Sequence, residues 1–221
     1  MRLLAPTVLR IAPAELRSRA RERFGGELRR AGSFAQLGLL GAQACLDAAG
    51  GGRPFGLLWT SAHGALLATQ AALAEQLLEG EPVMPFTFVA TQPHLCAALL
   101  AQRSHAVTRS AFLYLVPEDW PCLLQLAAAW LAECGQVLLG WVEESTVENL
   151  PHQSDWCLVA GGASGVKCEA VQAGAEVLQA TTADWLSRLA AWHGAPHAPL
   201  TLRGAAQAWR FSAAASAFEA S

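Results

Sequence analysis

Apolar and polar positions form blocks along the chain that predict helices and strands in turn. Apolar residues recur at helical spacing from Ser33 until Gly50 stops the pattern, and a second segment of this kind covers 65–78. Short, continuous apolar runs at 55–60 and 137–142 are typical of strands that are covered on both faces. Further strands are predicted at 110–116, 156–160 and 166–171, and further helices at 93–102, 119–135 and 182–192. This alternation predicts an α/β fold with layered helices around a mostly parallel mixed sheet.

Three stretches of the chain lack this alternation, namely its two ends and residues 81–92. Eight arginines fall within the first thirty residues and are interleaved with glutamates, which predicts a solvated basic arm rather than a targeting signal. Residues 81–92 contain two prolines and predict an ordered, partly extended loop. The expected organisation is a basic segment at 1–28, an α/β domain at 29–195 and a C-terminal tail at 196–221.

Composition narrows the classes of function. The 221 residues are 53% hydrophobic and 15% charged with a net charge of −3, which excludes a disordered chain and gives no broad electrostatic reason to bind nucleic acid. The longest apolar window, 122–142, is interrupted by polar residues, so no membrane span is expected. Six scattered cysteines without a C-x-x-C pair indicate neither a disulfide framework nor a metal site. We therefore expect a cytoplasmic protein without a cofactor.

Few residues suggest chemistry by themselves. The turn Thr60-Ser61-Ala62-His63-Gly64 follows a predicted strand but lacks the glycines of a phosphate-binding loop. Cys157 or Cys122 is a candidate nucleophile, with His63, His94 or His152 as the base, although a cysteine in an apolar strand is usually buried. These residues leave open a small cysteine-dependent acyltransferase or thioesterase-like enzyme.

Several segments, in order, resemble the N-terminal half of a β-ketoacyl synthase. The resemblance rests on Arg29-Arg30-Ala31-Gly32-Ser33-Phe34, the run Phe55 to Gly64, Pro85-Phe86-Thr87-Phe88, Gln92 to Ala98 and Gly140-Trp141-Val142-Glu143. It covers about residues 29–170 and implies an incomplete thiolase-like fold. The second half of a ketosynthase, with its two catalytic histidines, has no counterpart in the chain.

The departures from this family bear on function. Where ketosynthases carry their catalytic cysteine, this chain has Val116, Pro117 and Glu118, and the resemblance places Cys122 over a turn inside the following helix. The chain thus resembles the small ketosynthase-like, chain-length-factor-type proteins of aryl polyene and xanthomonadin-type pigment pathways. That resemblance implies a non-catalytic subunit that pairs with a full-length ketosynthase and shapes its acyl tunnel. A homodimeric scaffolding protein is a further alternative.

The same resemblance nominates two surfaces. The interface with the ketosynthase and the end of its tunnel are expected at Phe86, Phe88, His94, Phe112 and Tyr114. An acyl carrier protein or the partner's flank is expected to dock on Arg17, Arg19, Arg21 and Arg23. Because the predicted strand at 111–115 is apolar on both faces, it would need a partner to cover it.

Overall fold

The computed structural model describes residues 1–80, 82–116, 118–147, 149–162, 165–172, 177–193, 198–205 and 207–213. Its strands are β1 (Arg2–Ile11), β2 (Phe55–Ser61), β3 (Val107–Tyr114), β4 (Gln136–Glu143), β5 (His152–Ala160), β6 (Val166–Val171), β7 (Leu178–Gln179), β8 (Leu200–Arg203) and β9 (Ala208–Ser212). Its helices are α1 (Pro13–Phe24), the 3₁₀-helix η1 (Gly25–Arg30), α2 (Ser33–Ala48), α3 (Leu66–Leu77), α4 (Pro85–Ala90), α5 (His94–Ser104), α6 (Pro121–Cys134) and α7 (Trp185–His193).

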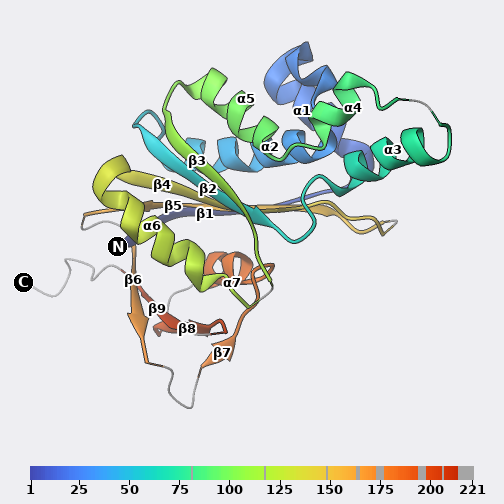
Figure 1. Ribbon diagram of the computed structural model, residues 1–221. Helices are drawn as coiled ribbons and strands as arrows, with labels where there is room; N and C mark the ends of the chain where they lie inside the picture. The colour runs from blue at the N-terminus through green and yellow to red at the C-terminus, as the bar shows by residue number, and fades with distance from the viewer. Residues whose placement is uncertain are drawn as a thin grey trace, which may run out of the picture.

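The strands form one mixed sheet in the order β3-β2-β4-β5-β1-β6-β9-β8-β7 (Figure 1). β2 pairs in parallel with both β3 and β4, whereas β5, β1, β6 and β9 continue the sheet with antiparallel pairing. β3 lies at one edge and is hydrogen-bonded to β2 on its inner side. The expected α/β class with a mixed sheet is confirmed.

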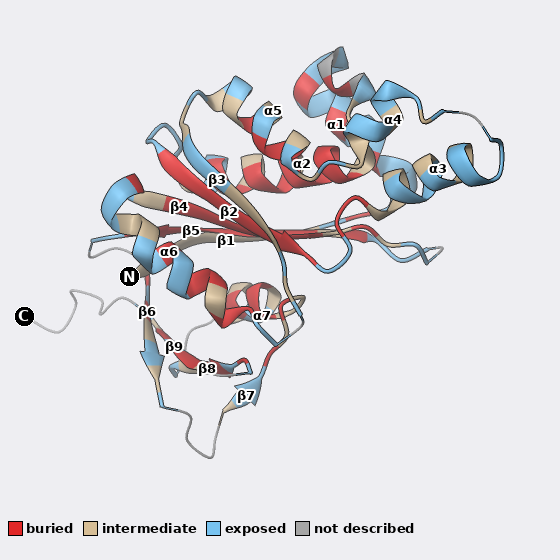
Figure 2. Cartoon of the chain, viewed as in Figure 1, coloured by how far each residue is buried: buried red, intermediate tan, exposed pale blue. Residues whose placement is uncertain are grey.

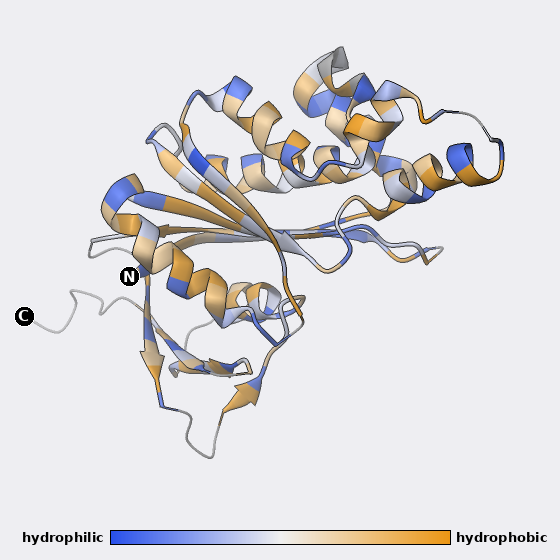
Figure 3. Ribbon diagram, in the orientation of Figure 1, coloured by the Kyte–Doolittle hydropathy of each residue, from blue (hydrophilic) through white to orange (hydrophobic). Residues whose placement is uncertain are grey.

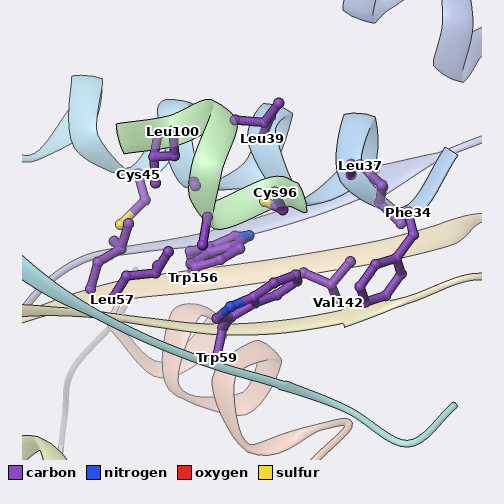
Figure 4. Packing of buried hydrophobic residues seen from close by; sticks show 14 of the residues in the cluster. Phe34, Leu37, Leu39, Cys45, Leu57, Trp59, Cys96, Leu100, Val142 and Trp156 are labelled. Atoms are coloured by element: carbon purple, nitrogen blue, oxygen red, sulfur yellow. The ribbon is translucent and has the colours of Figure 1, made fainter. Parts of the chain in front are cut away.

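Helices cover both faces of the sheet and enclose two hydrophobic cores. Helices α1 to α5 lie on one face, and α6 and α7 lie on the other (Figures 1 and 2). The first core centres on Trp59 and Trp156, which stack with their ring centroids 6.2 Å apart beneath α2 and α5 (Figure 4). A Cβ on Gly140 would overlap the Trp156 ring, so the glycine makes room for this stack. In the second core, Trp120 stacks on Trp185 with centroids 5.0 Å apart.

The expectation of a solvated N-terminal arm is wrong. β1 is an interior strand between β5 and β6, and its Leu3 and Ile11 side chains are buried. α1 buries Leu16, Ala20 and Phe24, which recur every fourth residue between the arginines. This sparse apolar stripe is sufficient to dock the helix, because the charged residues occupy its remaining faces.

Two further expectations are corrected. Within residues 81–92 the chain forms α4, which begins at Pro85, because proline is well suited to the first turn of a helix. Within the stretch expected to be a tail, β8 and β9 form an antiparallel pair, while 196–197 and 214–221 lie outside the described residues. The segments 156–160 and 166–171 could form either a hairpin or two successive strands, and the structure has the second arrangement, because β1 lies between β5 and β6 in the sheet.

Candidate functional site

The loop between β3 and α6 is the place where the resemblance expects a nucleophile. Val116 and Glu118 are exposed there, and Pro117 lies outside the described residues. The main chain of this loop is bound by the C-terminal part of the chain. Thr182 Oγ1 donates to the Val116 carbonyl at 3.0 Å, and the Ala205 amide donates to the Glu118 carbonyl at 2.8 Å.

Cys122 lies in the first turn of α6, not over a turn inside the helix as the sequence suggested. Its thiol is half-buried, and both this burial and the charge of nearby Asp119 raise its pKa. A helix N-terminus favours a thiolate, but here those two effects dominate.

Cys157 is even less suited to nucleophilic attack. It is fully buried in the second core, which raises its pKa well above the ordinary value. His152 lies five residues earlier on β5, so it faces the opposite side of the strand, and its Nδ1 accepts a hydrogen bond from the Ser145 amide. Within the part of the chain that the structure describes, no hydrogen bond joins a thiol to a histidine. The residues considered for a cysteine-dependent enzyme are therefore not brought together.

Three of the expected interface residues do lie together at the edge strand. Phe112 and Tyr114 meet edge to face with centroids 4.9 Å apart, and the ring of His94 at the start of α5 lies 6.4 Å from that of Phe112. Tyr114 is 63% exposed. Phe112, by contrast, packs inward on Trp59 at 4.7 Å.

The other two expected interface residues, Phe86 and Phe88, lie on α4 and are more than half exposed. They belong to a larger group of exposed apolar side chains, which we call the α3–α4 apolar patch. Its members are Leu73, Leu77, Leu78, Met84, Phe86, Phe88 and Val89. The ribbon of α3 and α4 includes apolar stretches, drawn in orange in Figure 3.

The two helices that carry the α3–α4 apolar patch are joined by Glu75. Its carboxylate accepts hydrogen bonds from the Met84 amide at 3.0 Å and from Thr87 Oγ1 at 2.9 Å. No residue of α3 is buried. Sequence reasoning missed Leu73, Leu77 and Met84, because apolar residues at helical spacing are usually part of a core.

The four arginines nominated for docking all lie on α1 and divide into two pairs. Arg19 forms an ion pair with Glu15 at 2.8 Å, and Arg23 forms one with Asp47. Arg17 and Arg21 instead line a pocket beside η1 and α2. Neither has an ion pair with any residue that the structure describes.

A polar cluster at the carboxyl ends of β2 and β4 escaped the sequence analysis. Glu143 accepts hydrogen bonds from Ser61 Oγ at 2.9 Å and from the Ala62 amide at 2.8 Å, and its other oxygen lies 2.8 Å from His63 Nδ1. Neighbouring Glu144 is buried, which raises its pKa, although it accepts hydrogen bonds from Ser33 Oγ and the Leu67 amide. The turn at Ser61–His63, which lacks the glycines of a phosphate-binding loop, thus binds this chain's own carboxylate.

The described residues contain no group of three side chains arranged to hold a metal ion. No helix among them is long and apolar enough to cross a bilayer.

Comparisons with known proteins agree with this architecture. No model of a protein family matches the sequence, and no curated protein matches it. A chain of the ketosynthase (ApeO) complex with its chain length factor (ApeC) from Xenorhabdus doucetiae matches with a TM-score of 0.65 and 17% identity, over 96% of this chain and 99% of that chain. The ishigamide ketosynthase/chain length factor matches with a TM-score of 0.55 and 13% identity, over 77% of this chain and 68% of that chain.

A third match is the type II polyketide synthase acyl-carrier protein in complex with its ketosynthase (AntDE:AntF). Its TM-score is 0.51 and its identity 13%, over 80% of this chain and 65% of that chain. At these identities the likeness establishes the fold alone. The chain has the thiolase-like fold of ketosynthases and of the chain length factors solved with them.

Proposed function

We propose that this chain is a non-catalytic subunit of the chain-length-factor type. It pairs with a full-length β-ketoacyl-acyl carrier protein synthase in the cytoplasm and shapes that enzyme's acyl tunnel, in aryl polyene or fatty-acid-like biosynthesis. One observation carries the proposal. The segment Val116–Glu118 has no nucleophile in its sequence, and the Val116 and Glu118 carbonyls accept hydrogen bonds from the chain's own C-terminal part, while the adjacent strand β3 lies at the edge of the sheet.

The open edge supports pairing with another chain. β3 is eight residues long and has no strand on its outer side in the described chain, and such an edge is a template for β-augmentation. Tyr114 at its end lies against Gly64, two residues before α3, and α3 carries Leu73 and Leu77 of the α3–α4 apolar patch towards its other end. An exposed apolar surface of this kind is typical of a protein interface. The similar complex from Xenorhabdus doucetiae, a ketosynthase with its chain length factor, supports the same partner class.

Within this interface, we assign the tunnel contact to exposed aromatic side chains. Phe88 and Tyr114 have free ring surfaces, whereas the guanidinium of Arg30 lies 4.6 Å above the ring of Phe86. Phe112 supports Tyr114 from within the chain, and the ring of His94 lies against that of Phe112. Aromatic rings suit this task because they bury a large area and have few rotatable bonds.

The basic face of α1 is proposed to dock the acyl carrier protein or the partner's flank. Arg19 and Arg23 already have carboxylate partners, so Arg17 and Arg21 are expected to contribute most. Exposed ion pairs contribute only about 0.2–1 kcal/mol each, so the effect should depend on several pairs and weaken with salt.

The test of pairing is co-expression with a full-length ketosynthase of the same pathway, followed by size-exclusion chromatography with light scattering. We expect a heterodimer that Tyr114→Asp disrupts, because the new charge would be buried unpaired at the contact. Leu178→Asp is the matched control, since Leu178 is 56% exposed on β7 at the opposite edge of the sheet. Phe112→Asp is less informative, because Phe112 packs on Trp59 within the chain. If the chain elutes as a monomer, or as a homodimer without bound ketosynthase, the proposed pairing is refuted.

The test of tunnel shaping uses the assembled complex and mass spectrometry of its products. Phe88→Ala should leave the heterodimer intact and lengthen the products, whereas Leu178→Ala should change neither. The chain alone should turn over no acyl thioester. Turnover that Cys122→Ala or Cys157→Ala abolishes would instead support a cysteine-dependent enzyme.

A further inference from the structure

A half-open pocket of about 440 Å³ lies where α1, η1 and α2 meet. Arg17 and Arg21 form its charged side, Ala20 and Leu28 are its apolar part, and Gln36 supplies a buried amide. Because Arg17 and Arg21 are four residues apart on one helix, their guanidinium groups project from the same face of α1. The pocket therefore combines two cations with an apolar wall.

The charge of these two arginines is uncompensated within the described residues. Arg19 and Arg23, only two positions further along in each case, are neutralised by Glu15 and Asp47. The same short helix thus holds one pair of arginines in internal ion pairs and leaves the other pair directed to a pocket. This difference marks Arg17 and Arg21 as the arginines available to a ligand.

Gln36 adds a hydrogen-bond acceptor, its side-chain oxygen Oε1, to the pocket. Only 6% of the residue is exposed, and its Nε2 donates to the Leu28 carbonyl at 3.1 Å and the Ala31 carbonyl at 2.7 Å. Both amide protons are thereby used. Its Oε1 accepts no hydrogen bond from the residues described, so it is left as an acceptor for a ligand that carries an N–H or O–H group.

We propose that the Arg17–Arg21 pocket binds a phosphate ester. The terminal phosphate oxygens lie between the two guanidinium groups, and a hydroxyl or amide of the organic part donates to Gln36 Oε1. Two planar guanidinium forks offer more donors than the two oxygens of a carboxylate can accept, whereas the three terminal oxygens of a phosphate ester suit them. The site shares Arg17 and Arg21 with the docking face proposed above, but it lies on α1 and does not involve pairing through β3, so it is tested on the chain alone.

Titration of the full chain at constant ionic strength tests this site, with inorganic phosphate, methyl phosphate, glycerol 3-phosphate and acetate as probes. We expect the phosphates to bind and glycerol 3-phosphate, which carries hydroxyl donors, to bind more tightly than methyl phosphate. The double variant Arg17→Gln/Arg21→Gln should weaken phosphate binding by at least about ten-fold. The control variant Arg19→Gln/Arg23→Gln removes the same charge and should leave binding within about two-fold.

Three results would overturn the proposal: no binding of any phosphate, equal losses in the two double variants, or acetate binding as tightly as methyl phosphate. Equal losses would mean that only net charge attracts the anion. Tight acetate binding would assign the pocket to a carboxylate instead.

Discussion

The backbone amide of Ala205 donates a hydrogen bond to the carbonyl oxygen of Glu118 at 2.8 Å, which joins the segment between β8 and β9 to the loop before α6. Gly204, which precedes Ala205, also lies close to this loop. A Cβ on Gly204 would overlap both the Glu118 carbonyl and the ring of Pro121. The Gln125 side chain on α6 also donates to Gln207. The segment around β8 and β9 is thus part of the folded domain and packs against the loop before α6 and against α6 itself.

Gly204→Ala should therefore destabilise the chain by about 1–3 kcal/mol, the usual cost of overpacking. Gly161→Ala is the matched control, because a Cβ on Gly161 meets no other atom within 4 Å. Thermal unfolding followed by circular dichroism measures the difference. Equal melting temperatures for the two variants would show that the C-terminal segment does not pack on this loop.

Thiol labelling tests the interpretation of Cys122. It is the half-buried member of six free thiols and should react with iodoacetamide first, whereas the five buried thiols should react only on unfolding. Burial and the charge of Asp119 raise its pKa, so labelling should be slow near pH 7 and accelerate as the pH rises. Asp119→Asn should lower the pKa and speed labelling at pH 8 by about two-fold. Glu133→Gln at the far end of α6 should not, and a faster wild type than Asp119→Asn would contradict the assignment.

Glu144 should make stability depend on pH. Burial raises its pKa above the ordinary value of 4.5, so the native state binds this proton more tightly than the unfolded state. Its stabilising contribution is complete below about pH 4.5 and is lost as the pH rises through the native pKa. Glu144→Gln keeps an oxygen acceptor for the Leu67 amide and Ser33 but does not ionise.

Urea unfolding between pH 4.5 and 8 measures this effect. Relative to the wild type, the free energy of unfolding of Glu144→Gln should rise across that range. A flat difference would mean that the Glu144 carboxyl titrates in the native state as it does in the unfolded chain.

Sequence patterns predicted the elements whose residues satisfy one local rule. The helix expected from Ser33 is α2, whose helical period stops before Gly50, and the continuous apolar run at 55–60 is β2, which is buried along its whole length. β1 was missed because its charges looked solvated. In the structure Arg10 forms an ion pair with Asp155, whose side chain is fully buried, and also donates to Ser187 at 2.9 Å. Such distant partners leave no local pattern.

The candidate site was predictable only in part, for a related reason. The family resemblance was sufficient to predict from the sequence that Val116–Glu118 carries no nucleophile. The hydrogen bonds that Ala205 and Thr182 donate to this loop join segments that are distant in the sequence, so no local pattern predicts them. The exposure of α3 was also hidden, because an apolar helical stripe looks the same whether a core or a partner covers it.

The last prediction concerns the aromatic support of the edge strand and rests on the proposed tunnel function. Phe112 packs edge to face on Trp59 with centroids 4.7 Å apart, and Trp59 stacks on Trp156. Trp59→Phe should remove part of the surface on which Phe112 packs, so that Phe112 can shift and the proposed end of the tunnel can widen. The complex should therefore still form but release longer products. The variant should also lose about 1–3 kcal/mol of stability, as large-to-small core changes do.

Trp120→Phe is a stringent control for this variant. Trp120 is equally buried in the second core, and its Nε1 donates to the Ala180 carbonyl at 3.0 Å, whereas Trp59 Nε1 has no hydrogen-bond partner among the described residues. Trp120→Phe should therefore cost at least as much stability while leaving product length unchanged. If both variants lengthen the products equally, the change in product length is due to loss of stability and not to the contact between Trp59 and Phe112. If Trp59→Phe leaves product length unchanged while Phe88→Ala lengthens the products, the exposed side chains alone control product length.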